Sequence, residues 1–245
     1  MSISIKDASD IEGMRVAGRL AAEVLDYLEP HIKPGVTTNH IDQLAHDYMV
    51  QVQGCIPAPL NYAPNGYKPY PKSICTSINH QVCHGIPSDK VLKKGDIVNV
   101  DITVIKDGWH GDTSRMFVVG EGSIAAKRLC QITYEAMWRG IMKVRPGAHL
   151  GDIGHTIQTF AESQGYSIVR EFCVEPLGCQ RGLSALLIRM LRVPSAASTM
   201  RINTRHSLRN GVALTLVVCL GVVDVAPLSA AAPVNSSTTT TPATT

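Results

Sequence analysis

Two aspartates flank a turn signal near the middle of this 245-residue sequence. Asp107-Gly108 lies between two β-rich runs, and an Asp-Gly pair in that setting predicts a two-residue type I′ β-hairpin. With that turn, Thr103 pairs with Asp112, and Asp101 pairs with Ser114. Asp101 and Asp112 then lie diagonally on one face of the hairpin, with Cβ atoms roughly 7 Å apart or less.

Two carboxylates on one face of a largely apolar ribbon repel each other unless a proton, a basic partner or a cation intervenes. A pair of divalent ions about 3.5–4 Å apart, bridged by carboxylates, fits this spacing. The alternative is a solvated hairpin face that carries two ordinary acids. The register of the hairpin matters here, because a three-residue loop would send the two acids to opposite faces.

Apolar residues at helical spacing predict the elements that surround the hairpin. We expect Ser9 and Glu12 to form the capping box of a first helix, and Thr37 or Thr38 to cap a second. Ser123 can cap a third. The predicted helices cover residues 10–29, a stretch from about 38 that stops at Gly54, a stretch after Ser123 that breaks at Pro146-Gly147, and a fourth that ends near Gly165.

Between the second helix and the hairpin, residues 56–72 are rich in proline and predict a loop. Alternating residues predict a strand from Ser73 to Asn79 and another from Ser167 to Phe172. A weak internal repeat relates Pro34-Gly35 to Pro146-Gly147, each between two helices. If the repeat is real, a second strand pair should follow it, and we do not identify one after Cys173.

Composition excludes some classes of protein and divides the chain. The net charge of +3 gives no indication of a nucleic acid or membrane partner. Seven cysteines without close pairing are typical of reduced thiols, and the first residues lack a signal-peptide core, so we expect a cytoplasmic protein. From Val174 onwards there is no lysine or aromatic residue, which predicts a boundary between residues 173 and 174.

The last part of the chain has no clear globular pattern. The apolar run 212–223 is too short for a bilayer span of about 20 residues, and Asp224 follows it. From about residue 230, alanine, proline, serine and threonine predict a disordered tail. A membrane anchor or a secreted stalk is the alternative.

Six motifs occur in order along residues 1–173. They are Met14-Arg15-Val16-Ala17-Gly18, Tyr70-Pro71-Lys72-Ser73-Ile74-Cys75, Ser77-Ile78-Asn79, Cys83-His84-Gly85-Ile86-Pro87, Gly95-Asp96-Ile97-Val98-Asn99-Val100-Asp101 and Gly111-Asp112-Thr113-Ser114. Together they resemble the bacterial type I methionine aminopeptidases of peptidase family M24. The resemblance implies an α+β pita-bread fold, of which residues 1–173 would form the first half and the start of the second.

The same resemblance implies a site and an activity. Asp101 and Asp112 match two ligands of a pair of divalent metal ions, which are cobalt, manganese, iron or zinc. His84 matches a catalytic histidine, and Tyr67, Tyr70 and Cys75 match residues that bind the methionine side chain. The implied partners are the N-termini of nascent polypeptides, with the ribosome as a candidate place of encounter, and the implied state is a monomer.

After Cys173 the sequence departs from the family pattern. The family continues with Gly-His-Gly-Ile-Gly, whereas this chain reads Val174-Glu175-Pro176-Leu177-Gly178. We therefore do not find the family's histidine ligand or its two glutamate ligands, and neither Glu175 nor His206 has a motif around it. An altered reading frame or an aberrant transcript would explain the change.

Two functions from different classes follow from these observations. The first is a metal-dependent aminopeptidase that removes the initiator methionine. The second is a truncated or frame-shifted half-domain, catalytically inactive, that keeps only part of the metal site. Residues 174–245 would then be a non-homologous segment in either case. Cys75, Cys83 and His84 also have simpler roles open to them, as small core residues and a structural loop histidine.

Overall fold

The predicted hairpin forms at Asp107-Gly108 in the computed structural model of the chain, which describes residues 5–64, 66–81, 83–168, 186–190 and 214–218. Strands β3 (Ile97–Lys106) and β4 (Trp109–Val118) pair antiparallel on either side of the turn. Asp107 and Gly108 have φ angles of 49° and 84°, and two positive values in succession are those of a type I′ turn. The two-residue loop is thus confirmed, and the three-residue alternative is excluded.

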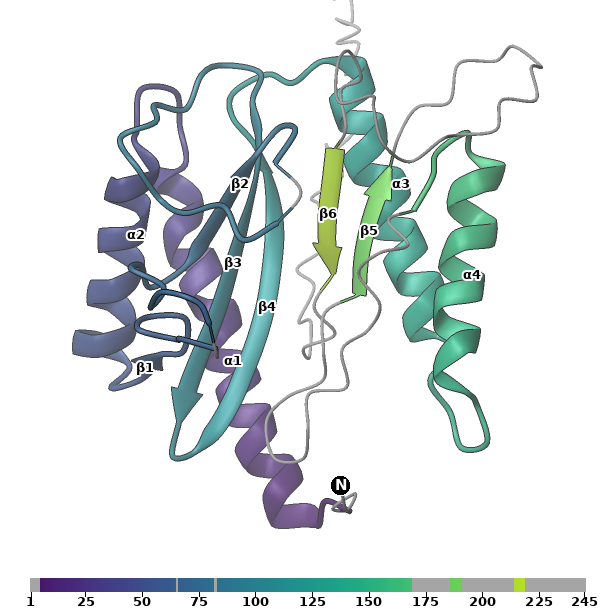
Figure 1. Cartoon of the computed structure of the whole chain (residues 1–245), viewed down its shortest axis with the longest axis horizontal. Coiled ribbons are helices and arrows are strands. Elements are labelled where there is room, and N and C mark those ends of the chain that lie inside the picture. Colours follow the sequence, from purple (N-terminus) through teal and green to yellow (C-terminus); the bar gives the residue numbers. More distant parts are fainter. Residues whose placement is uncertain (1–4, 65, 82, 169–185, 191–213, 219–245) are drawn as a thin grey trace, which may run out of the picture.

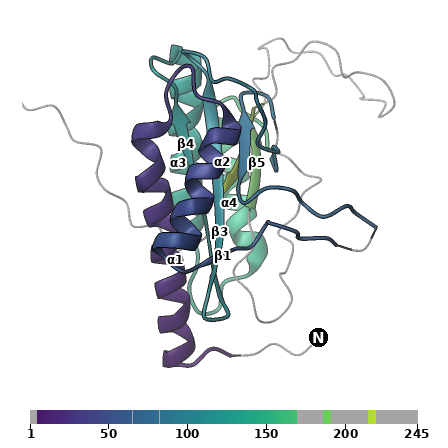
Figure 2. The same cartoon turned by 90° about the vertical axis from the view of Figure 1, so that its left-hand side faces the viewer.

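Two shorter strands complete the sheet on the other edge of β3. These are β1 (Ile56–Pro57) and β2 (Cys75–Ile78), and both pair antiparallel with β3. The second lies inside the strand predicted from Ser73 to Asn79. Between β1 and β2 the chain makes the predicted proline-rich loop, which extends away from the sheet in Figure 2.

Helices α1 (Ala8–Leu28) and α2 (Thr38–Asp47) lie side by side on one face of this sheet (Figures 1 and 2). A 3₁₀ turn (Glu29–His31) follows α1, and a π-helical turn (Tyr48–Val52) follows α2. Alternate β3 residues face the helices, because successive side chains of a strand point to opposite faces. The core between the layers includes Val24, Leu25, Leu28, Ile41, Ala45, Ile78, Val98, Val100, Ile102 and Val104.

Helix α1 begins earlier than the sequence predicted. Asp7, and not Ser9, is the N-cap, because its carboxylate accepts a hydrogen bond of 2.9 Å from the Asp10 N–H. Asp10 in turn accepts one of 3.1 Å from the Asp7 N–H. Two acids near the positive end of the helix dipole are favourable there. The predicted capping box of Ser9 and Glu12 is therefore wrong, and Glu12 forms an ion pair with Arg15 instead.

The other two predicted caps are confirmed. The Thr37 hydroxyl accepts a hydrogen bond from the His40 N–H at 3.2 Å and starts α2. Ser123 accepts one from the Ala126 N–H at 3.1 Å and starts helix α3 (Ile124–Ile141).

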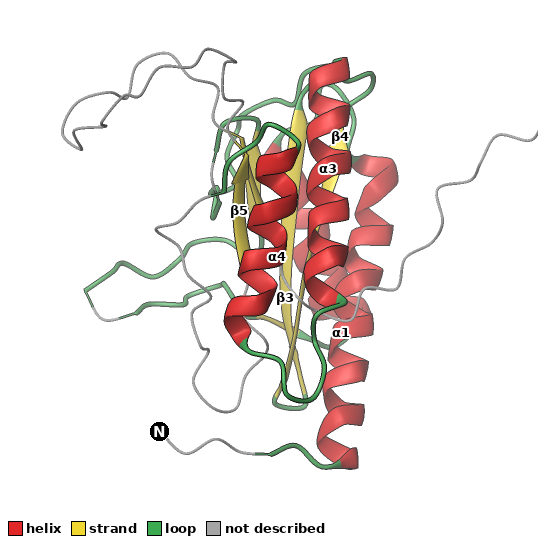
Figure 3. Cartoon of the chain, turned by 90° about the vertical axis from the view of Figure 1, so that its right-hand side faces the viewer, coloured by secondary structure: helices red, strands yellow, loops and turns green. Residues whose placement is uncertain are grey.

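Helix α4 (Leu150–Ser163) packs against α3 around a second core, and the two lie next to each other in Figure 3. That core consists of Ala136, Ile153, Ile157, Phe160 and Ala161.

The two Pro-Gly breakers occupy equivalent turns. Gly35 and Gly147 both have positive φ angles, 92° and 83°, and each lies between two helices.

A second strand pair also exists, contrary to our expectation from the sequence after Cys173. Strands β5 (Leu186–Met190) and β6 (Leu214–Val218) pair antiparallel, and β6 contacts β4 while β5 contacts α3 (Figure 1). Short apolar runs of five residues suit such strands, and periodicity alone does not identify them.

Several expectations fall outside the described residues. These are most of the strand predicted to Phe172, the boundary between residues 173 and 174, Glu175, His206 and the tail from about residue 230. Within the described part of the chain, no helix has the length and apolar character needed to cross a bilayer.

Candidate metal and substrate site

Asp101 and Asp112 lie on the same face of the hairpin. The register pairs Asp101 with Ser114 and Thr103 with Asp112, so the two acids are diagonal neighbours, as predicted. Both side chains are partly buried. Their face is the one that points away from α1, because Gly111, the neighbour of Asp112, faces the backbone of that helix at Ala17.

Thr103 orients one of these carboxylates. Its hydroxyl donates a hydrogen bond of 3.0 Å to Oδ1 of Asp112, the residue paired with it across the hairpin. This hydrogen bond holds the Asp112 carboxylate in one orientation on the face that it shares with Asp101.

Cys75 of β2 extends this face to the next strand. It pairs with Asp101 and is 8% exposed. Burial raises the pKa of the Cys75 thiol to about 12, and the negative charge of Asp101 adds to the effect. Burial also raises the pKa of the Cys83 thiol, and Asp101 again contributes. Cys75 is therefore a neutral thiol at neutral pH, and it gives the site a small, weakly polar wall.

Tyr70 connects the two chain segments beside this wall. Its hydroxyl lies 3.1 Å from the Ile74 carbonyl oxygen and 3.3 Å from that of Gly85, and it donates to them. Burial raises the pKa of the Tyr70 phenol, and the neighbouring Cys75 thiol and the carboxylates of Asp42 and Asp101 act in the same direction. The phenol therefore stays protonated and remains a donor.

His84 precedes Gly85, whose carbonyl accepts hydrogen bonds from the Tyr70 hydroxyl and the Thr76 N–H. It is exposed, and its φ of 51° lies in the left-handed region that non-glycine residues rarely adopt. The next residue, Gly85, fixes this conformation through two hydrogen bonds to β2. The Gly85 carbonyl accepts a 2.7 Å hydrogen bond from the Thr76 N–H, and the Gly85 N–H donates to the Ser77 hydroxyl. A Cβ on Gly85 would overlap the Thr76 carbonyl oxygen.

The structure thus brings together four of the six predicted site residues, Asp101, Asp112, Cys75 and Tyr70. His84 is linked to them through the next residue, Gly85, whose carbonyl accepts from Tyr70. Tyr67 is not brought to this group. It is 75% exposed on the loop between β1 and β2. A resemblance in sequence places a residue in a motif, whereas the loop conformation decides where its ring lies.

Sequence analysis missed Asp42. It lies on the buried face of α2 and is 8% exposed, among Ile41 and Ala45. Its carboxylate contacts Lys72, Ser73 and Ile74, just before Cys75. An acid within the apolar stripe of a helix was the available signal, because buried carboxylates need dedicated partners.

Oxygen ligands of this kind suit a hard divalent cation. Among the described residues, no three His, Cys, Asp or Glu side chains are grouped so that they could hold a metal ion. Asp101 and Asp112 therefore fit a metal as a two-carboxylate platform. Two carboxylates alone make an open site, so tight binding would require further ligands.

Replacing Tyr70 by phenylalanine tests the link between the two segments. The variant leaves the Ile74 and Gly85 carbonyls without the phenol donor, and we expect the free energy of unfolding to fall by about 1 kcal/mol. Urea denaturation followed by circular dichroism measures it. Tyr67→Phe, which changes an exposed phenol, is the matched control and should leave stability unchanged; equal effects for both variants would contradict the assigned contact.

Comparisons with known proteins identify the family and the relatives of this chain. A model of metallopeptidase family M24 matches residues 12–216. Methionine aminopeptidase from Rickettsia prowazekii is 57% identical over 178 residues, which are 73% of this chain and 66% of that protein. Methionine aminopeptidase from Escherichia coli K12 is 55% identical over 179 residues, with the same coverage. The chain thus spans just under two thirds of the length of these relatives.

Solved structures confirm the α+β pita-bread fold. The crystal structure of methionine aminopeptidase from Rickettsia prowazekii has a TM-score of 0.69 and 42% identity, and covers 88% of this chain and 93% of its own. That from Thermotoga maritima has a TM-score of 0.65 and 31% identity, with 78% and 82% covered. A Bacillus anthracis Xaa-Pro dipeptidase shares the fold alone, with a TM-score of 0.61, 19% identity, and 88% and 59% covered. By motif, fold and sequence, this chain belongs to metallopeptidase family M24.

Proposed function

We propose that this chain is a metal-dependent aminopeptidase that removes the N-terminal methionine from polypeptides. The observation that carries the proposal is the shared face of Asp101 and Asp112, next to Cys75 and Tyr70. Relatives named methionine aminopeptidase, at 55% and 57% identity, support the choice of substrate.

In this proposal each residue has a separate role. Asp101 and Asp112 would hold divalent metal ions, whose chemistry would be to polarise a peptide carbonyl and to lower the pKa of a water molecule. Cys75 and Tyr70 line the slot for the methionine side chain, since a neutral thiol and an aromatic ring suit a thioether and reject charge. Tyr67 would join them only if its loop folds over the substrate. His84 presents an imidazole that can exchange a proton with the substrate.

Finer features of the proposal rest on the resemblance. They are a monomeric state, nascent polypeptides as substrates, with the ribosome as a place of encounter, and cobalt, manganese, iron or zinc as the metal. The proposed cytoplasmic location rests on the cysteine usage instead. The further ligands known in the family, one histidine and two glutamates, were not identified in the sequence. The structure does not describe residues 169–185, where the family motif would fall.

The test is release of methionine from the peptide Met-Ala-Ser by the purified full chain. The chain is stripped with EDTA and assayed with added Mn²⁺ or Co²⁺. We expect release only with metal and much slower release of leucine from Leu-Ala-Ser. The absence of release, with the chain folded and metal present, would contradict the proposal and favour the inactive half-domain.

Metal binding is measured separately from turnover. A ligand that binds only the folded state stabilises it by about 2.7 kcal/mol at a concentration of 100 Kd. We therefore expect Mn²⁺ to raise the melting temperature of the stripped chain and EDTA to reverse the change. A half-domain that keeps part of the site would show this shift without turnover.

A further inference from the structure

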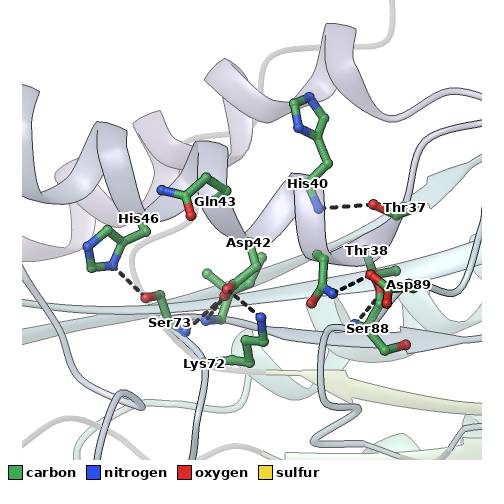
Figure 4. A network of polar contacts seen from close by, with 12 residues as sticks. Thr37, Thr38, His40, Asp42, Gln43, His46, Lys72, Ser73, Ser88 and Asp89 are labelled. Atoms are coloured by element: carbon green, nitrogen blue, oxygen red, sulfur yellow. Dashed lines mark hydrogen bonds and ion pairs between the residues drawn. The ribbon is translucent and has the colours of Figure 1, made fainter.

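A polar network outside the predicted site joins α2 to residues 72–74 (Figure 4). These residues lie between Tyr70 and Cys75, which together we call the substrate wall. The Asp42 carboxylate is almost fully buried, and its Oδ1 accepts hydrogen bonds from two successive backbone N–H groups, those of Ser73 at 2.9 Å and Ile74 at 3.2 Å. A carboxylate acceptor makes these bonds stronger than those to a neutral group. One side chain thus fixes the peptide backbone just before β2.

Two more contacts hold the same segment. Lys72 Nζ lies 3.7 Å from Asp42 Oδ2 and balances its charge. The His46 Nδ1 and the Ser73 hydroxyl lie 2.8 Å apart. Figure 4 shows that Asp42 and His46 reach Ser73 from successive turns of α2. Residues 72–74 are therefore bound to the helix through backbone and side chain alike.

This segment lies between the two residues assigned to the substrate wall. Tyr70 precedes it, and the Tyr70 hydroxyl donates to the carbonyl of Ile74. The N–H of the same residue, Ile74, donates to Asp42. Cys75 follows it and pairs with Asp101. A shift of the 72–74 backbone would therefore move both Tyr70 and Cys75 relative to the carboxylates.

The N-terminal half of α2 holds the segment that follows His84 in a similar way. The Thr38 hydroxyl donates to the Ser88 carbonyl at 3.0 Å and accepts from the Ser88 N–H at 2.9 Å. The Asn39 amide donates to the Asp89 carboxylate at 2.7 Å. Helix α2 thus supports two segments that adjoin predicted site residues, one between Tyr70 and Cys75 and one after His84. Asp42 makes the buried, charged contact to the first of them.

We propose that Asp42 is a positioning residue for the methionine slot, which it shapes by fixing residues 72–74 and through them Tyr70 and Cys75. This inference rests on the proposed function. A carboxylate that served the core alone would be costly to bury, whereas here both of its oxygens face donors of the segment that leads into the site.

Activity gives the first test, with Asp42→Ala, Asp42→Asn and the control Asp47→Ala compared. Asp47 lies on the same helix, where its carboxylate accepts hydrogen bonds from the side-chain amides of Gln43 and Gln51. For metal-loaded chain and Met-Ala-Ser, we expect Asp42→Ala to raise KM about tenfold with a smaller change in kcat. Asp42→Asn keeps an oxygen that accepts from both N–H groups, so its KM should lie close to that of the parent chain. Asp47→Ala should have the KM and kcat of the parent chain.

A second readout does not need turnover. In Asp42→Ala we expect hydrogen exchange at the Ser73 and Ile74 amides to accelerate at least about tenfold, while the amides of β4 keep their protection. Iodoacetamide should also modify Cys75 faster, with the modification of Cys130 unchanged. If the parent chain releases no methionine, the proposed function fails. The exchange and modification measurements still show whether Asp42 holds Tyr70 and Cys75 in position.

The result that overturns the proposal is a folded Asp42→Ala chain with unchanged exchange at Ser73 and Ile74 and an unchanged KM. Asp42→Asn failing to restore KM or amide protection would overturn it as well. If Asp42→Ala does not fold, His46→Ala replaces it, because it removes only the contact to the Ser73 hydroxyl. That variant should change exchange at Ser73 in the same direction by a smaller factor, and no change there would count against the proposal.

Discussion

Asp112→Asn and Asp101→Asn will each lower the affinity of the chain for Mn²⁺ at least about 100-fold, since residues that merely orient metal ligands already account for 10–100-fold. Each variant removes one of two negative charges that share a face of the hairpin. An asparagine oxygen is a weaker ligand than a carboxylate oxygen for a hard cation. Isothermal titration of the stripped chain with Mn²⁺ measures the change, and methionine release should fall with it.

The matched control is Asp107→Asn. It removes the same charge from the same hairpin, at an exposed position whose φ of 49° asparagine also adopts. We expect its Mn²⁺ affinity to equal that of the parent chain. If all three variants lost affinity equally, the general charge of the hairpin would explain binding, and the assignment of Asp101 and Asp112 as ligands would be wrong.

Gly111→Ala will lower the free energy of unfolding by about 1–3 kcal/mol, the usual cost of forcing an extra carbon into a packed interior. A Cβ at Gly111 would overlap the Ala17 carbonyl and approach the Gly18 N–H. Both atoms belong to the backbone of α1, which cannot move aside as a flexible side chain can. The helix and β4 must therefore separate, and the hairpin that carries Asp112 must shift with them.

Gly154→Ala on α4 is the control for Gly111→Ala. A Cβ there would meet no atom within 4 Å, and alanine is favoured over glycine in a helix by about 0.5–1 kcal/mol. We expect this variant to be as stable as the parent chain or more stable, by urea denaturation. A Gly111→Ala chain with parent stability would show that α1 does not pack as closely on β4 as the structure has it.

Local signals in the sequence predicted the elements that position the metal ligands. The Asp107-Gly108 turn fixes its own register, and that register alone places Asp101 and Asp112 on one face. Thr37 and Ser123 cap helices for equally local reasons. The start of α1 was missed because Asp7 and Ser9 are both good N-caps, and the choice depends on the reciprocal Asp10 contact.

The rest of the site depends on contacts between residues far apart in the chain, and local sequence patterns do not predict such contacts. Asp42 is 31 residues from Ser73 in the chain, so no local pattern shows that the two meet. The same holds for the contact between the Tyr70 hydroxyl and the Gly85 carbonyl, which ties the tyrosine to the loop of His84. Tyr67 lies on a loop whose conformation no hydrophobic pattern determines, and motif membership did not predict its exposure.

The most direct test of the metal site is anomalous diffraction from crystals of the full chain soaked in Mn²⁺. We expect an anomalous peak within coordination distance of carboxylate oxygens of both Asp101 and Asp112. A well-diffracting soaked crystal with no peak between these two side chains, or with its manganese bound elsewhere, would contradict it.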